Sequence, residues 1–264
     1  GTLPTYRPYE GLRFEDQVRA VLDQKVPVFS FICGIPPKEI LQECRRQQIV
    51  LMGTATTVDE ARALEESEVD VIVASGQEAG GHRGSFLKPA GESLVGTFSL
   101  VPQVADAVSL PVVAAGGIAE ARGVLAALAL GAEGVLLGTA FAVSPLSGAS
   151  PAYRAALLGR HAGRTALTRG FTGRLARGVD NELMALLNGP EIDLLPYPLQ
   201  RQLVRHLTDA AQKAGKDDLA IFWAGQSADL IRTDDAMALI DELASAVGSL
   251  AGLVLAFAGA RRHR

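Results

Sequence analysis

Residues 69–84 read VDVIVASGQEAGGHRG, a short apolar segment followed at once by a glycine-rich turn. The apolar segment, residues 69–75, is typical of a strand buried on both faces, because its β-branched residues lack a regular polar alternation. Glycine in the turn lets the backbone pass close to a ligand, since no Cβ intervenes. A buried strand that ends in such a turn is typical of parallel α/β folds.

More segments of the same kind lie on both sides of residues 69–75. They are residues 26–32 (VPVFSFI), 49–55 (IVLMGTA), 110–115 (LPVVAA) and 133–137 (EGVLL). Between them, apolar residues recur at helical spacing, as in residues 14–22, 40–44, 100–108 and 120–130. Strands that alternate with single helices predict parallel βαβ units and an α/β fold.

One of the intervening helices carries a start signal. Thr57 and Glu60 have the spacing of a capping box, in which a hydroxyl and a carboxylate bind exposed N–H groups at the helix start. We therefore expect the helix after residues 49–55 to begin at Thr57.

The strand pattern stops after about residue 142. Helical patterns follow at residues 153–158, 182–187, 199–215 and 235–247. We therefore expect two parts: a barrel-type part over residues 1–142, and a helical region over residues 143–264 that packs on it. The apolar run at residues 250–257 is shorter than the roughly 20 residues that span a bilayer. It predicts a packed or frayed helix in preference to a membrane anchor.

The composition narrows the classes of function. The chain has 264 residues, 25 basic and 29 acidic side chains, and 48% hydrophobic residues, which excludes a disordered chain. A net charge of −4 without a basic block argues against nucleic acid or an anionic membrane as the main partner. Two cysteines, Cys33 and Cys44, exclude a disulfide scaffold and a cysteine-only metal site. A reduced, cytoplasmic location is the simplest interpretation.

Three glycine-centred turns follow strands directly, at residues 75–84, 115–118 and 138–141. Because the carboxyl ends of parallel strands meet at one edge, Gly116-Gly117 and Gly138-Thr139 would direct backbone N–H groups to one point. Such a point predicts a phosphate site, although the glycines could also serve only as tight turns. Neither a Walker motif nor GxGxxG occurs in the chain, so a Rossmann nucleotide site is not expected.

His82 lies in the glycine-rich turn, shortly after a buried strand. Its imidazole titrates near neutral pH and can accept a proton during a reaction. A metal site is not expected, since no second His or Cys lies at ligand spacing. His161, His206 and His263 are interpreted as structural or exposed. His82 is therefore the candidate general base.

These segments together resemble the nitronate monooxygenase (2-nitropropane dioxygenase) family. The resemblance rests on residues 76–84 (GQEAGGHRG), 111–118 (PVVAAGGI) and 137–141 (LGTAF), and on the C-terminal segments 173–178 (GRLARG), 195–199 (LPYPL) and 222–227 (FWAGQS). The first two segments also resemble flavin-type enoyl-acyl-carrier reductases, whereas the C-terminal ones are similar to nitronate monooxygenases proper. The resemblance implies an FMN-dependent TIM-type (β/α)8 barrel.

The same resemblance implies roles for individual residues. His82 would be the base in an oxidation of nitroalkanes or nitronates by O2 to carbonyl compounds and nitrite. FMN contacts are implied at Ser75, Gly80, Gly116, Gly117, Leu136, Leu137, Gly138 and Thr139. Tyr197 would line the substrate pocket. Where the family often has Gln, this chain has Ser75 and Leu136, and Arg201 and Arg205 stand where some members carry Tyr and Lys.

The resemblance also implies eight barrel strands, whereas five are predicted here, so we expect a barrel without its N-terminal part. Either that part belongs to a longer protein or the chain is a truncated relative with altered function. An open sheet edge favours pairing with another chain, such as a second copy. Two alternatives to a nitronate monooxygenase stay open. One is another FMN-dependent reductase on the same barrel, acting on enoyl thioesters or quinones with NAD(P)H. The other is a relative that keeps the fold without catalysis.

Overall fold

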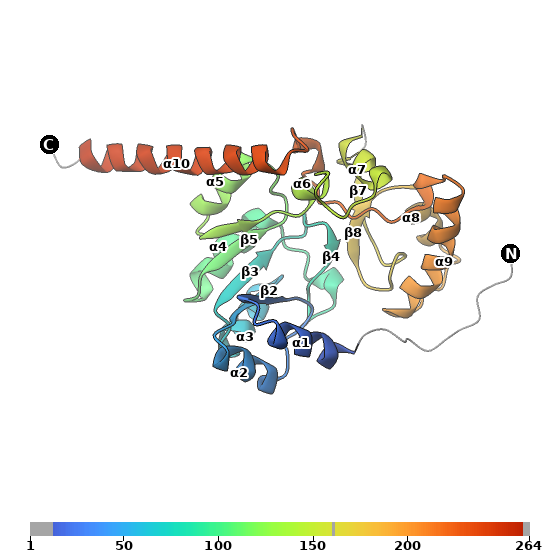
Figure 1. The fold of residues 1–264 in the computed structure, drawn as a ribbon, viewed down its shortest axis with the longest axis horizontal. Coiled ribbons are helices and arrows are strands. Elements are labelled where there is room, and N and C mark those ends of the chain that lie inside the picture. Colours follow the sequence, from blue (N-terminus) through green and yellow to red (C-terminus); the bar gives the residue numbers. More distant parts are fainter. Residues whose placement is uncertain (1–12, 160–161, 261–264) are drawn as a thin grey trace.

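The computed structural model describes residues 13–159 and 162–260 of the chain, with side chains as far as residue 249. Its centre is a sheet of five parallel strands in the order β1-β2-β3-β5-β6 (Figure 1). The strands are β1 (Val28–Phe31), β2 (Val50–Ala55), β3 (Val71–Ser75), β5 (Val112–Ala115) and β6 (Gly134–Leu136). These are the five strands predicted from the sequence. Neighbours in the sheet follow each other along the chain, as in a TIM-type barrel.

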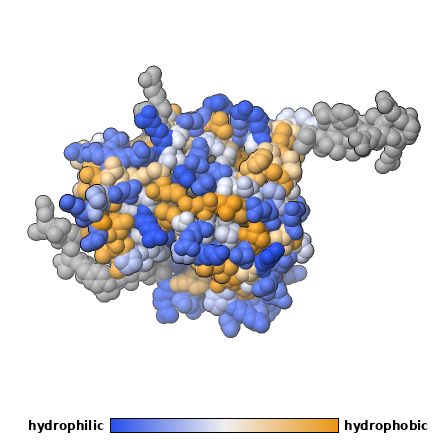
Figure 2. Space-filling model, turned by 180° about the vertical axis from the view of Figure 1, so that it is seen from behind, coloured by the Kyte–Doolittle hydropathy of each residue, from blue (hydrophilic) through white to orange (hydrophobic). Residues whose placement is uncertain are grey.

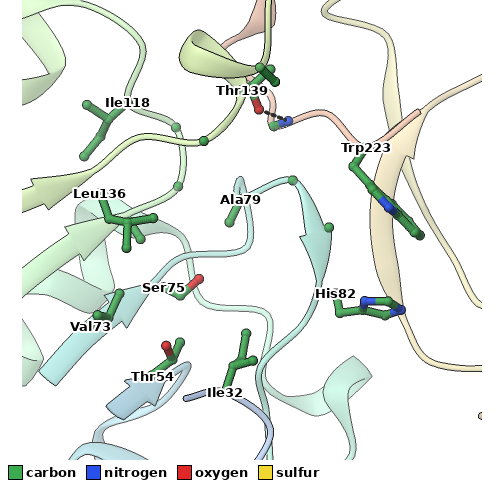
Figure 3. A pocket seen from close by; sticks show the side chains of 18 of the residues that line it. Ile32, Thr54, Val73, Ser75, Ala79, His82, Ile118, Leu136, Thr139 and Trp223 are labelled. Carbon is green, nitrogen blue, oxygen red and sulfur yellow. Dashed lines mark hydrogen bonds between the residues drawn. The ribbon is translucent and has the colours of Figure 1, made fainter. Parts of the chain in front are cut away.

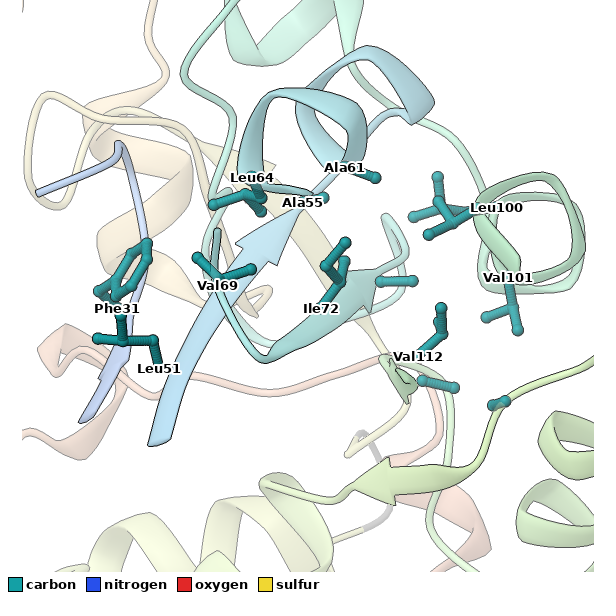
Figure 4. Packing of buried hydrophobic residues seen from close by; sticks show 14 of the residues in the cluster. Phe31, Leu51, Ala55, Ala61, Leu64, Val69, Ile72, Leu100, Val101 and Val112 are labelled. Carbon is teal, nitrogen blue, oxygen red and sulfur yellow. The ribbon is translucent and has the colours of Figure 1, made fainter. Parts of the chain in front are cut away.

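Helices separate these strands, as the apolar spacing predicted. They are α1 (Phe14–Asp23), α2 (Lys38–Arg46), α3 (Val58–Glu66), α4 (Thr97–Ala107) and α5 (Ala121–Ala129). Leu64 of α3 and Leu100 of α4 pack with Leu51 and Ile72 of the sheet in one apolar cluster (Figure 4). Gly53 of β2 allows close packing here, because a Cβ on it would lie 2.4 Å from a methyl group of Leu64. This cluster is the main core.

The start of α3 confirms half of the expected capping box. The Thr57 hydroxyl accepts a hydrogen bond from the Glu60 N–H at 3.2 Å. The Glu60 carboxylate is fully buried and binds elsewhere: it accepts from the N–H and the hydroxyl of Thr56, both at 2.7 Å. Its other oxygen accepts from the N–H groups of Phe86 and Leu87. Glu60 therefore connects the start of α3 to the segment that follows residue 84.

The second half of the chain contains strands, so the prediction that strands stop after residue 142 is wrong. Strands β7 (Thr165–Thr168) and β8 (Ala176–Val179) pair antiparallel, and β8 pairs with β4 (Gly81–His82). Polar residues interrupt both strands, Thr165 and Thr168 in β7 and Arg177 in β8, so neither gives an apolar strand pattern. Because β4 belongs to the glycine-rich turn after β3, the two halves share a sheet instead of meeting as separate layers.

The helices predicted in this half are present. The α-helices after β6 are α6 (Thr139–Ala142), α7 (Pro151–Leu158), α8 (Glu182–Leu187), α9 (Leu199–Lys213) and α10 (Ala236–Ala260). Two short 3₁₀ turns, η2 (Asp217–Leu219) and η3 (Ala228–Leu230), also lie here, whereas η1 (Ala90–Glu92) precedes α4 in the first half. The first turns of α10 pack near α5, with Leu239 against Ala119 and Ala140, and the helix then leaves the body (Figure 1).

No helix in the part of the chain that the structure describes is long and apolar enough to cross a membrane. The side chains of the apolar run at residues 250–257 lie outside the described ones. On the face seen from behind, a band of apolar residues crosses the molecule between hydrophilic ones (Figure 2). Apolar groups of this kind are a normal part of a protein surface.

Candidate active site

A cavity of about 560 Å³ opens at the carboxyl ends of the parallel strands. Each strand contributes at least one residue at or next to its end, among them Ile32 (β1), Thr54 (β2), Ser75 (β3), Ala115 (β5) and Leu136 (β6). Figure 3 shows the strand-end side chains on one side, with His82 and Trp223 opposite them. The volume lies in the range typical of small-molecule sites.

The two glycine turns predicted to bind phosphate both line this cavity. Gly116 and Gly117 follow β5 with φ of +95° and +75°, and Gly138 and Thr139 follow β6. Within the described part of the chain, the N–H groups of Gly117, Gly138 and Thr139 have no hydrogen-bond acceptor. A Cβ on Gly138 would meet no atom within 4 Å, so a side chain there would occupy open space. Free N–H groups around open space are the donor set that binds a phosphate.

Residues 222–227 close this cradle from the second half of the chain. The Gly225 N–H donates to the Thr139 hydroxyl at 3.0 Å, as drawn in Figure 3. The Ser227 hydroxyl donates to the Gly117 carbonyl. A Cβ on Gly80 would lie 2.6 Å from the Gly225 nitrogen, so the glycine-rich turn packs directly on this segment. The segment thus joins the turns after β3, β5 and β6.

The turn that carries His82 is held by three arginines, of which Arg83 and Arg177 are buried. Arg83 is fully buried, and its guanidinium donates to the carbonyls of Gly76 at 2.7 Å and Ser75 at 2.8 Å. Arg177 donates to the Gln77 carbonyl at 2.9 Å, and Arg174 to the Ser85 carbonyl at 2.7 Å. None of the three arginines forms an ion pair with a carboxylate among the described residues.

Burial lowers the pKa of Arg83 and Arg177 below the ordinary arginine value. The other end of the turn is tied to α4, because the Glu78 carboxylate accepts from the Thr97 N–H at 2.9 Å. Glu78 thereby caps α4, and the glycine-rich turn is anchored along its whole length.

His82 lies on β4, half-buried and in the cavity lining. Its Nε2 is 2.8 Å from the hydroxyl oxygen of Thr172. The ring centroid lies 5.2 Å from that of Trp223 and 5.7 Å from that of Tyr197, whose ring is edge-on. Burial, and after it the positive charge of Arg174, lowers the pKa of His82 below the ordinary histidine value. This lowered pKa favours the neutral imidazole, which is the form that accepts a proton.

The structure brings together most of the residues predicted for the site. Ser75, Gly80, His82, Gly116, Gly117, Leu136, Gly138 and Thr139 all line the cavity. Leu137 does not: successive residues in extended chain point to opposite sides, and Leu137 packs toward Ala119 and Ala140 in the core. Tyr197 stands beside His82 without being part of the cavity lining.

The remaining candidates lie elsewhere. Arg201 and Arg205 are exposed on α9, where Arg205 pairs with Asp209 at 3.5 Å. His206 is also exposed on α9. His161 and His263 fall outside the described residues.

Several lining residues were not predicted. Thr54, Ile118, Tyr153, Trp223, Gly225 and Ser227 contribute to the cavity. Thr54 could have been found, because it is the polar residue near the end of a predicted strand. Trp223 and Ser227 belong to residues 222–227, and nothing in the spacing of these residues predicts that they lie near the strand ends. Tyr153 also binds the Trp223 carbonyl through its hydroxyl, and burial raises its pKa to about 12.

Known proteins resemble this chain over most of its length. The family model described as nitronate monooxygenase matches residues 3–246. Proteins named probable nitronate monooxygenase from Staphylococcus aureus strains MSSA476 and JH9 are each 42% identical over 248 residues, which cover 94% of this chain and 70% of the relative.

Among solved structures, a nitroalkane oxidase from Streptomyces ansochromogenes is similar at a TM-score of 0.82 and 39% identity, over 90% of this chain and 70% of that one. FabK from Thermotoga maritima is similar at a TM-score of 0.70 and 29% identity, over 90% of this chain and 75% of that one.

Proposed function

The chain belongs to the nitronate monooxygenase family of oxidoreductases, and from this we propose that it oxidises nitronates or nitroalkanes with O2 to carbonyl compounds and nitrite, using FMN. One observation supports the proposal most: a half-buried histidine lines the same cavity as a set of free backbone N–H groups. Proton removal from carbon and binding of a phosphate-bearing cofactor can therefore take place within one space.

The residues present fit FMN. The N–H groups of Gly117, Gly138 and Thr139 would hold its phosphate, because they have no other acceptor among the described residues. Ser75, Gly80, Gly116 and Leu136 line the same cavity and complete the proposed binding set. FMN, when bound, takes electrons from the substrate and passes them to O2. Leu137 would contribute only through its backbone, because its side chain packs in the core.

His82 would take the proton from the carbon atom that bears the nitro group. Its lowered pKa favours the neutral form, and the rings of Trp223 and Tyr197 lie beside it. A positioned general base of this kind contributes roughly 10²–10⁴-fold to the rate. A preformed nitronate has already lost this proton, so it needs His82 less.

The proposed partners are a small-molecule substrate and O2. The second half of the chain would line the substrate side of the cavity through Tyr153 and Trp223. Both cysteines are unpaired thiols, in keeping with the cytoplasmic location proposed. We also propose that the chain associates with a second copy of itself.

A visible spectrum and two assays test the function. We expect a yellow protein with flavin absorbance that consumes O2 and releases nitrite with nitronates. Rapid anaerobic bleaching of the flavin by NAD(P)H, without nitronate turnover, would indicate a reductase on the same barrel instead. A colourless protein that FMN does not reconstitute would indicate a relative without this catalysis.

A further inference from the structure

The connection between β7 and β8 reaches the candidate base directly. It is closed by hydrogen bonds from the N–H groups of Thr172 and Gly173 to the Arg169 carbonyl, at 3.2 and 2.7 Å. Thr172 is 2% exposed, and its hydroxyl oxygen lies 2.8 Å from Nε2 of His82. A buried side chain thus contacts one of the two ring nitrogens of His82.

The direction of this hydrogen bond follows from the other contacts of the Thr172 hydroxyl. Its oxygen accepts from the Arg174 N–H and lies within reach of the Arg174 carbonyl, both at 3.3 Å. The hydroxyl has a single proton. In the part of the chain that the structure describes, this hydroxyl is the hydrogen-bond donor of the Arg174 carbonyl. If the proton turned to His82, that carbonyl would lose its donor, which is unfavourable.

We propose that Thr172 is a positioning residue that accepts a hydrogen bond from Nε2–H of His82 and so leaves the lone pair on Nδ1 for the substrate proton. Nδ1 has no hydrogen-bond partner among the described residues, and the ring lines the cavity. A ring nitrogen is committed as donor or acceptor by the partner of the other nitrogen. The inference rests on the proposed function, since it specifies how His82 would act as base.

The same connection holds the surroundings of His82 in place. Arg174 donates to the carbonyls of Arg83 and Ser85, which follow His82 in the chain. Gly173 has a φ of +88°, and a Cβ on it would lie 2.5 Å from the Leu195 carbonyl oxygen and the Tyr197 nitrogen. Residues 172–174 therefore contact His82, the turn that bears it and the segment that presents Tyr197. This gives residues 173–178, conspicuous in the sequence, a physical role.

The hydrogen bond has a defined effect on proton affinity. If Nε2–H donates to Thr172 in both protonation states, the bond is stronger when the ring is charged. Thr172 then favours the imidazolium and raises the pKa of His82 relative to a variant without the hydroxyl. The opposite arrangement, with the hydroxyl donating to Nε2, would favour the neutral ring. The charged or titratable groups near the ring, Arg83, Arg174, Arg177 and Tyr197, are unchanged in such a variant.

Two variants and one spectroscopic measurement test the proposal. Thr172→Val keeps the shape and removes the hydroxyl, and Thr172→Ser keeps the hydroxyl. The ¹⁵N shifts of the His82 ring are followed by NMR over pH, with His82→Asn used to assign the signals. We expect the wild type to carry the proton on Nε2, Thr172→Val to have mixed tautomers and a lower pKa, and Thr172→Ser to resemble the wild type. A wild type protonated on Nδ1, or a pKa that rises in Thr172→Val, overturns the proposal.

The kinetic arm uses neutral nitroalkanes and preformed nitronates. In Thr172→Val we expect kcat on the neutral substrate to fall about tenfold or more, as for loss of a partner that orients a catalytic ring, with KM little changed. The acid limb of kcat/KM should move to lower pH. Equal losses on both substrates, or a change in KM alone, would assign Thr172 a structural role. If the wild type oxidises neither substrate, the proposed function fails, and the NMR result still decides the tautomer.

Discussion

The two halves of the molecule are stabilised in different ways. In residues 13–142, one apolar cluster of strands and helices forms the core, with residues such as Leu51 and Ile72 fully buried. After residue 142 the apolar clusters are smaller, and buried polar side chains connect separate segments. Gln200 is an example: it is 2% exposed, donates to the Gly170 carbonyl and accepts from the Leu195 N–H. The first half thus has a large apolar core in addition to buried polar connections such as that of Glu60, whereas the second half has only small apolar clusters beside its hydrogen bonds.

The cavity lies between these two kinds of structure. The strand ends and glycine turns come from the first half, whereas Trp223, Gly225 and Ser227 come from the second half. His82 belongs to β4, which pairs with β8 of the second half. We therefore expect changes in the first half to act on the cofactor or on global stability. Changes in the second half should act on the base and its surroundings.

The largest expected effect is loss of the cofactor from the scaffold side. Gly138→Val should fold, because its backbone has a negative φ and a Cβ there meets nothing within 4 Å, yet the side chain would occupy the phosphate cradle. We expect the variant to purify without flavin and without oxidase activity, as measured by visible absorbance and nitrite release. Gly117→Val is a less clean test, because φ of +75° strains any side chain.

Gly148→Val is the matched control for this prediction. Gly148 is exposed, also has open space around it and does not line the cavity, so its variant should keep flavin. If Gly138→Val retains stoichiometric FMN, the cradle is not the phosphate site.

The second prediction concerns the base, where the halves meet. His82→Asn keeps a hydrogen-bonding group and removes proton acceptance, so turnover of neutral nitroalkanes should fall by roughly 10²–10⁴-fold. Preformed nitronates should be affected much less. The measurement is kcat/KM on both substrates with flavin content determined in parallel. Equal losses would show that His82 supports the flavin or the fold, and no loss on either would remove it from the mechanism.

The contrast between the halves also explains which parts of the molecule could be predicted from the sequence. The five parallel strands and their helices were predictable, because apolar spacing reports burial directly. The glycine turns were predictable because they follow those strands. The side chain of Leu137 packs in the core, and alternation along an extended chain already separates its direction from that of Leu136.

Strands β4 and β8 were not predictable in the same way. β4 has two residues, and β8 contains the buried Arg177, so neither has an apolar period of its own. Their pairing is accompanied by hydrogen bonds from Arg177 to the Gln77 carbonyl and from Arg174 to the Ser85 carbonyl, contacts between residues about 90–100 positions apart in the chain. Long-range polar contacts of this kind leave no local pattern. Thr172 was missed for the same reason.

A third prediction measures the scaffold itself. Leu64 of α3 is fully buried in the main apolar cluster. Leu64→Ala should therefore lower the free energy of unfolding by about 2–5 kcal/mol. Urea denaturation at fixed FMN concentration measures it. The folded fraction of Leu64→Ala should keep the wild-type ratio of nitroalkane to nitronate turnover, because Leu64 contacts neither His82 nor the cavity. A changed ratio would contradict the separation of roles between the halves.

A fourth prediction breaks a polar connection. Arg174→Met removes hydrogen bonds from a charged group to the carbonyls of Arg83 and Ser85, at a cost of about 1.5–3 kcal/mol in unfolding free energy. It also removes the charge that helps to lower the pKa of His82. That pKa should therefore rise, and because the base must be unprotonated, the acid limb of kcat/KM should move to higher pH. Arg174→Lys, which keeps the charge, should shift the limb less, and an unmoved limb in both would exclude the electrostatic role.

The smallest expected effects come from helix caps, and they compare the halves most directly. Thr57 caps α3 in the first half through a single hydrogen bond with the Glu60 N–H. Asn181 caps α8 (Glu182–Leu187) in the second half by accepting from the Met184 N–H, and it also donates to the Ala220 carbonyl at 2.7 Å. Thr57→Ala should cost about 1 kcal/mol. Asn181→Ala should cost about 2 kcal/mol, because it loses a cap and a long-range hydrogen bond.

Ser150 supplies the matched control within the second half. It caps α7 (Pro151–Leu158) by accepting from the Tyr153 N–H and makes no long-range hydrogen bond among the described residues, so Ser150→Ala should resemble Thr57→Ala in urea denaturation. If Asn181→Ala costs no more than Ser150→Ala, the bond to Ala220 contributes nothing to stability. The second half would then depend on its small apolar clusters, as the first depends on its large one. If Asn181→Ala costs more than Ser150→Ala, the hydrogen bond from Asn181 to Ala220 fastens α8 to the segment that leads into Trp223. The stability of the cavity wall then depends on a hydrogen bond between residues about 40 positions apart in the chain.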